Sequence, residues 1–132
     1  MNGTLRTLFF SPTHSSRKIA LVLGESLTAA LGKSQESRDL TFPLDREKSL
    51  DCGPDDVLVF AFPVYGGRVP QVLEAPLSRL RGNGATAVIA AVYGNRDYDD
   101  ALLEAADLLT RRGFTVAAAG AFIAEHSVAP TV

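Results

Sequence analysis

Three short stretches that are almost entirely apolar constrain the fold of this chain more than any other feature. They cover residues 5–10, 57–62 and 86–93, and a fourth stretch of the same kind covers residues 115–122. Uninterrupted apolar runs of this length are typical of strands buried on both faces in a parallel sheet. A strand with one solvent-exposed face instead alternates apolar and polar residues. The sequence therefore predicts a central parallel sheet.

Helical patterns separate these stretches. Apolar residues at helical spacing run from Ile19 to Leu31, where Gly32 is placed to end the helix. A second pattern covers residues 70–80 and contains Pro76, which predicts a kink or a restarted turn.

The third helical pattern is the most clearly marked and covers residues 102–109. Asp99 and Asp100 precede it, and Arg111 and Arg112 follow it. Acidic residues at the start and basic residues at the end complement the helix dipole, so both ends of this helix are predicted.

The order of these elements predicts a doubly wound α/β fold. Residues 36–41 form a more polar run, which suits an edge strand, and residues 45–56 predict a polar connection. Strands that alternate with helices imply right-handed βαβ units, so we expect one domain over residues 1–132 with strand order 2-1-3-4-5. In such sheets ligands bind beyond the carboxyl ends of the strands, where the strand order reverses. The loops after strands one, three and four should therefore converge on one crevice.

The composition excludes several function classes. The 132 residues carry a net charge of -2, which gives no basic surface for nucleic acid. Cys52 is the only cysteine, so this chain alone forms no disulfide and no cysteine-based metal cluster. No apolar run approaches the roughly 18 residues of a membrane span, and the N-terminus lacks a signal-peptide pattern. We expect a cytoplasmic protein that binds neither nucleic acid nor membrane.

The loop after the first strand reads SPTHSS, residues 11–16. Hydroxyl and backbone N–H groups at the start of a helix meet in its positive field, which suits an anion. Hydrogen bonds to a charged group contribute roughly 1.5–3 kcal/mol each, so four or five could hold a phosphate without a lysine. The nucleotide-binding patterns GxxxxGK[ST] and GxGxxG are absent. The simpler alternative is that Ser15 or Ser16 caps the helix and the rest is a turn.

Two further loops pair aromatic residues with glycine. Tyr65, Gly66 and Gly67 follow the third strand, and Tyr93 and Gly94 end the fourth. Glycines let a peptide reorient and a planar ring approach closely, although a turn that needs positive φ explains them equally well. The joint placement of the three loops favours one ligand with a phosphate at one end and a flat ring at the other.

On these residues the chain resembles a known family. SPTHSS resembles the phosphate loop of flavodoxins, of the form [ST]-x-T-x-[NS]-[ST], with His14 and Ser15 at its variable and Asn/Ser positions. FPVYGGRVP, YGNRDYDDAL and GAFIAEHSV resemble bacterial proteins that join an N-terminal flavodoxin-like domain to a C-terminal ferredoxin domain. The similarity covers nearly the whole chain, and YGNRDYDDAL is quite specific.

The resemblance implies a non-covalently bound FMN, with no catalytic side chain and no metal. The first loop would hold the phosphate, and the other two would enclose the ribityl chain and the isoalloxazine ring, with Tyr65 and Tyr98 against the ring. The implied cofactor-binding residues are Ser11, Thr13, His14, Ser15, Ser16, Pro63, Val64, Tyr65, Gly66, Tyr93, Gly94, Asn95, Arg96 and Tyr98. We also expect Arg68 and Arg96 to raise the flavin's reduction potential, because a cation favours the more negative reduced ring.

The chain departs from the family pattern at its C-terminus. Only ten residues follow Phe122, too few for the helix that covers the sheet in the family, and the cysteines of two iron-sulfur clusters are absent. These departures predict a domain truncated at the C-terminus that lacks the last helix, with an exposed apolar strip in its place. Such a strip predicts a tendency to form a homodimer.

Two functions remain. The first is an FMN-binding electron-transfer domain coupled to a ferredoxin-type iron-sulfur domain or protein. The alternative is an FMN-dependent NAD(P)H or quinone reductase, and a module that has lost its flavin is a third hypothesis. A receiver domain is disfavoured because Phe10 and Ser11 stand where it needs an acidic pair. A low-molecular-weight phosphatase is disfavoured because the phosphate loop has no cysteine.

Overall fold

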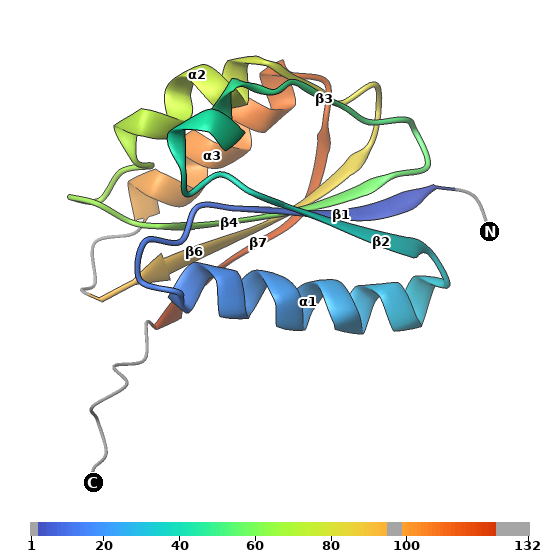
Figure 1. The fold of residues 1–132 in the computed structure, drawn as a ribbon, viewed down its shortest axis with the longest axis horizontal. Helices are drawn as coiled ribbons and strands as arrows, with labels where there is room; N and C mark the ends of the chain where they lie inside the picture. The colour runs from blue at the N-terminus through green and yellow to red at the C-terminus, as the bar shows by residue number, and fades with distance from the viewer. Residues whose placement is uncertain (1–2, 95–98, 124–132) are drawn as a thin grey trace, which may run out of the picture.

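The computed structural model describes residues 3–94 and 99–123 and contains a five-stranded parallel sheet in the order β2-β1-β4-β6-β7 (Figure 1). The strands are β1 (Thr4–Phe9), β2 (Ser34–Asp39), β4 (Val57–Pro63), β6 (Thr86–Tyr93) and β7 (Thr115–Ile123). This is the predicted doubly wound order, with these five strands taking the places of predicted strands one to five. The polar edge strand is β2, which begins and ends two residues earlier than predicted.

Helices cover both faces of the sheet. α1 (Ser15–Leu31) lies across one face, while α2 (Glu74–Ser78), α3 (Asp99–Arg111) and the 3-10 helix η1 (Pro43–Glu47) lie on the other (Figure 1). α1 ends where the sequence predicts, because Gly32 adopts a left-handed φ of 68° that favours glycine. Among the described residues, no helix combines the length and the apolar character needed to cross a membrane.

The helical segment predicted over residues 70–80, with a kink or a restarted turn, covers residues 71–78 in two parts, and its predicted end at residue 80 is wrong. The chain forms a short 3-10 helix, η2 (Gln71–Leu73), and then the five residues of α2. It continues as β5 (Leu80–Arg81), which pairs in parallel with β3 (Leu50–Asp51). The predicted polar connection therefore contributes a strand to a second, two-stranded sheet.

The apolar spacing over residues 70–80 comes from three successive short segments. Leu73, Leu77 and Leu80 are each at most 3% exposed and pack into the same core, but they come from η2, α2 and β5. Pro76 lies in the first turn of α2, the part of a helix that tolerates proline. Burial along one side of the chain therefore produced a helical spacing without one continuous helix.

Asp56 joins the amino ends of β1 and β4. One carboxylate oxygen accepts the N–H of Thr4 at 2.7 Å, and the other accepts the N–H of Gly53 at 2.8 Å and Nε of Arg6 at 3.3 Å. Burial raises the pKa of Asp56, but these donors outweigh that effect and hold it below its ordinary value. The ionised carboxylate therefore stabilises the fold at neutral pH, and this contribution is lost as the pH falls through the folded-state pKa.

Candidate cofactor-binding site

The loops after β1, β4 and β6 leave the sheet at one edge, because these strands are parallel neighbours. Phe9 of β1 lies beside Ala61 of β4, and Pro63 of β4 lies beside Val92 of β6. Figure 1 shows the turn into α1 and the loop after β4 at this edge, where β6 also ends. The strands that precede the three loops therefore end at one edge of the sheet, and the predicted convergence of the loops on one crevice stays a prediction.

The first loop is fixed by its own serine. Ser11 is 6% exposed, its hydroxyl accepts the N–H of Arg17 at 2.9 Å, and its N–H donates to Oγ1 of Thr41 at 3.0 Å. Arg17 lies in the first turn of α1, so Ser11 caps the helix from six residues upstream. The capping role that the simpler alternative gave to Ser15 or Ser16 thus belongs to Ser11.

The surface of this loop consists of the residues between Ser11 and the helix. His14 is the N-cap of α1 and has a φ of 72°, which is uncommon for any residue except glycine. Thr13 and His14 are exposed, and Ser15 is partly exposed. The N–H groups of Ser15 and Ser16 lie in the first helical turn, where a helix supplies no carbonyl to bind them. Hydroxyls beside such N–H groups are an arrangement that can hold a phosphate.

The second loop is a tight hairpin. The N–H and carbonyl of Tyr65 pair with the carbonyl and N–H of Arg68, both at 3.0 Å. Gly66 and Gly67 between them have φ values of 58° and 77°, as in the type I′ turn that glycine adopts most readily. A Cβ added to Gly66 would meet nothing within 4 Å, and the Tyr65 ring is half exposed. An open peptide beside an exposed aromatic ring offers a surface for a planar ligand.

Only the start of the third loop belongs to the described residues. Tyr93 is partly buried, and Gly94 is exposed, with open space where a Cβ would stand. Asn95, Arg96 and Tyr98 lie outside the described residues. The ring contact expected of Tyr98 and the electrostatic role expected of Arg96 stay predictions.

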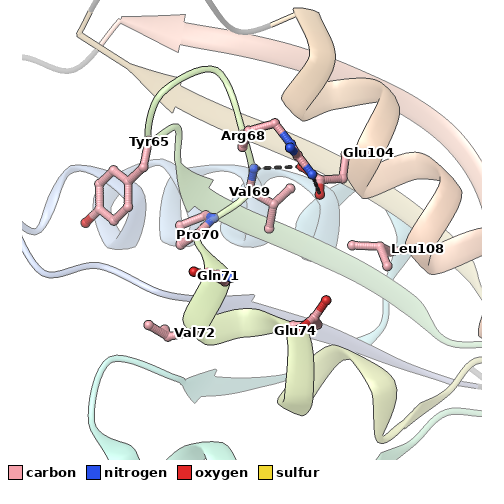
Figure 2. Close-up of a pocket in the computed structure, with 9 residues that line it drawn as sticks. All are labelled: Tyr65, Arg68, Val69, Pro70, Gln71, Val72, Glu74, Glu104 and Leu108. Atoms are coloured by element: carbon pink, nitrogen blue, oxygen red, sulfur yellow. Dashed lines mark hydrogen bonds and ion pairs between the residues drawn. The ribbon is translucent and has the colours of Figure 1, made fainter.

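An open pocket of about 610 Å³ lies beside the hairpin, between η2 and α3 (Figure 2). It is lined by Tyr65, Arg68, Val69, Pro70, Gln71, Val72, Glu74, Glu104 and Leu108. Among the described residues, Tyr65 is the one that it shares with the predicted site. The pocket therefore flanks the predicted crevice and does not include the phosphate loop.

Arg68 forms an ion pair with Glu104, a residue that the sequence analysis did not predict to be its partner. Nε and Nη2 of its guanidinium donate to Oε1 and Oε2 of Glu104 at 3.0 and 2.8 Å (Figure 2). This carboxylate opposes the positive charge that was expected to act on a flavin ring, so the geometry gives that role of Arg68 no support. Glu104 lies 36 positions away on an acidic helix, and no local sequence signal marks it as a partner of the hairpin.

No protein-family model and no curated protein matches the sequence, but solved structures match the fold. The flavodoxin of Megasphaera elsdenii in its two-electron reduced form is 16% identical, with a TM-score of 0.67, covering 93% of this chain and 88% of that chain. The flavodoxin of Streptococcus pneumoniae TIGR4 is 18% identical, with a TM-score of 0.63, covering 94% and 88%. An apo NADH:FMN oxidoreductase is 16% identical, with a TM-score of 0.58, covering 91% and 74%. The chain has a flavodoxin-like fold.

Proposed function

We propose that this chain binds FMN at the carboxyl edge of its sheet and serves as an electron-transfer domain. The observation that carries the proposal is the hydroxyl-rich start of α1, which shares an edge with the Tyr65 hairpin. The helix end suits a phosphate, and the open peptide at Gly66 beside an exposed ring suits a flavin. The likeness to flavodoxins supports the same cofactor.

The residues of the chain would bind and orient, while bound FMN would supply the redox chemistry. Thr13, Ser15 and the N–H groups of the first turn of α1 would bind the phosphate. Ser11 would keep that turn in place, because its own hydroxyl and N–H are already used within the protein. Tyr65 would pack against the ring and exclude water from one side.

We extend the proposal to the partner and the compartment. The resemblance to fusion proteins supports a ferredoxin-type iron-sulfur domain or protein as the partner, in the cytoplasm. Cys52 cannot supply such a cluster, since it is the only cysteine and is 4% exposed. Burial raises the pKa of its thiol to about 11, so the thiol stays protonated and unreactive at neutral pH.

Comparing the binding of FMN and riboflavin to the purified protein tests the proposed cofactor. We expect FMN to bind at least about 100-fold more tightly, because riboflavin lacks the phosphate and its charge-assisted hydrogen bonds. Flavin fluorescence quenching measures both affinities. Equal affinities would overturn the phosphate site.

A charge placed in the first loop gives a sharper test. Ser15→Asp should weaken FMN binding by about tenfold or more, because the carboxylate would repel the phosphate while suiting the helix end. Ser49→Asp is the matched control, since Ser49 is exposed and lies outside the three loops. An unchanged FMN affinity in Ser15→Asp would count against the first loop as the phosphate site.

The pocket beside Tyr65 favours one competing function, the FMN-dependent NAD(P)H or quinone reductase. Its volume of about 610 Å³ is in the range of small-molecule sites, so it could accept a second ligand next to the flavin. Stopped-flow spectra of the FMN-loaded protein mixed with NADPH separate the two functions. A carrier should leave NADPH unused, whereas rapid bleaching of the flavin by NADPH would establish the reductase.

A further inference from the structure

One carboxylate on α3 accepts three hydrogen bonds from the loop after β4. Oε1 of Glu104 accepts Nε of Arg68 and the N–H of Val69, both at 3.0 Å, and Oε2 accepts Nη2 of Arg68 at 2.8 Å (Figure 2). Paired bonds between a guanidinium and a carboxylate fix orientation as well as distance. The Arg68 guanidinium lowers the pKa of Glu104 and outweighs its partial burial, so Glu104 is ionised at neutral pH.

This contact holds the one hairpin that contains two consecutive glycines. Arg68 closes the turn through its two backbone bonds to Tyr65, and Gly66 and Gly67 form the tip. Glycine has the greatest backbone freedom of any residue, so such a tip takes its position from its anchors. On the β4 side the anchor is the N–H of Val64, which donates to the carbonyl of Val92 at 2.9 Å. On the other side the anchor is Glu104.

We propose that Glu104 is a positioning residue of the flavin site: it fixes the Tyr65 hairpin relative to α3. The inference rests on the proposed binding of FMN and adds a residue outside the predicted cofactor-binding set. α3 packs against β6 and β7, so this carboxylate joins the Tyr65 hairpin to a helix that is fixed on the sheet. Glu104 thereby fixes the position of the hairpin relative to that helix.

The proposal predicts a loss of order in the hairpin when the carboxylate is removed. In Glu104→Ala, Val69 loses the acceptor of its N–H and Arg68 loses both side-chain bonds. Hydrogen exchange of the Arg68 and Val69 amides in the flavin-free protein should accelerate by about tenfold or more. FMN must then order the hairpin as it binds, so its affinity should fall by about three- to tenfold. The fluorescence of bound FMN should rise, because the Tyr65 ring is no longer held against the flavin.

Three comparison variants separate positioning from loss of charge or of fold. Asp107→Asn removes the same charge one turn further along α3, where the partner is Arg111 on the same helix, so it should change none of the three measurements. Glu104→Gln keeps an oxygen for the Val69 N–H and should recover part of the exchange protection and of the affinity. Arg68→Ala removes the exposed partner of Glu104 and leaves the sequence of α3 unaltered. It should reproduce most of the loss of exchange protection and of FMN affinity.

The outcomes are distinct. Unchanged amide exchange in both Glu104→Ala and Arg68→Ala would overturn the anchoring itself. Faster exchange with unchanged FMN affinity and fluorescence would show that the hairpin lies outside the flavin site, which overturns the positioning role. If the unaltered protein takes up no FMN, the proposed function fails and the positioning role fails with it, while the exchange data still decide whether Glu104 holds the hairpin.

Discussion

The two faces of the central sheet are built very differently. Within residues 3–94 and 99–123, twenty buried hydrophobic residues, among them Phe60 and Phe62, form one core on the face covered by α2 and α3. On the face covered by α1, four buried residues form a separate cluster, namely Phe9, Ala20, Ala61 and Ala90. Hydrophobic stabilisation scales roughly with the apolar area buried, so the face under α2 and α3 supplies most of it.

The α1 face is nevertheless tightly packed where the helix crosses β1. A Cβ added to Gly24 would lie 2.6 Å from Cγ2 of Thr7, so helix and sheet touch through a glycine. The face opens beyond the helix: a groove of about 400 Å³ there includes Leu27 and Val88, and Ala118 of β7 is exposed beside Val88. The exposed apolar strip predicted from the sequence stays a prediction, because Lys33, Asp55 and Asp56 also line this groove. The two faces therefore differ in the number of buried hydrophobic residues more than in how closely their side chains pack.

Removing a large side chain from the core under α2 and α3 should lower the stability of the protein the most. Phe62 is completely buried and its ring stacks on Phe60 with centroids 5.0 Å apart. Phe62→Ala should lower the free energy of unfolding by about 3–5 kcal/mol in urea denaturation. Phe122→Ala is the control on the α1 face, where Phe122 is only partly buried, and should lower it by about 1 kcal/mol. Equal losses would mean that the α1 face is covered in solution.

The same contrast explains how much of the fold the sequence could predict. Strands buried on both faces need apolar residues at every position, so β4 and β6 were located to within a residue of their ends. α3 was equally clear because its burial is one-sided and its ends carry opposite charges. The bounds of the short segments η2, α2 and β5 were not predicted. Their apolar residues fill one part of the core, although the three segments have different backbone conformations.

The candidate site was predictable in its placement and only partly in its contacts. Gly66 and Gly67 signalled a turn with positive φ, and the topology placed that turn next to the SPTHSS loop. The cap that Ser11 supplies and the anchor that Glu104 supplies depend on pairs 6 and 36 positions apart, set by tertiary packing. No local pattern encodes such pairs.

A methyl group at the tightest point of the α1 face should have an intermediate effect. Gly24→Ala gains helix propensity but forces the added carbon against Thr7, whose branched side chain is 1% exposed and cannot move freely. Overpacking outweighs the gain, so the free energy of unfolding should fall by about 1 kcal/mol. Val22→Ala on the exposed side of α1 should leave it within about 0.5 kcal/mol. A stabilised Gly24→Ala protein would show that α1 can shift and that this face is loosely fitted.

The smallest effect should come from the open part of the α1 face. Ala118→Lys adds a long charged side chain to β7 beside the groove, where it can stay in water. We therefore expect the free energy of unfolding to change by no more than about 0.5 kcal/mol in dilute protein.

We propose that a second copy of the chain covers this strip at high concentration, since exposed apolar patches of this kind favour association. Sedimentation velocity should then show a concentration-dependent dimer that Ala118→Lys weakens. A protein that stays monomeric at every concentration would rule out the dimer, and a large loss of stability in the dilute variant would show that the strip is already covered within one chain.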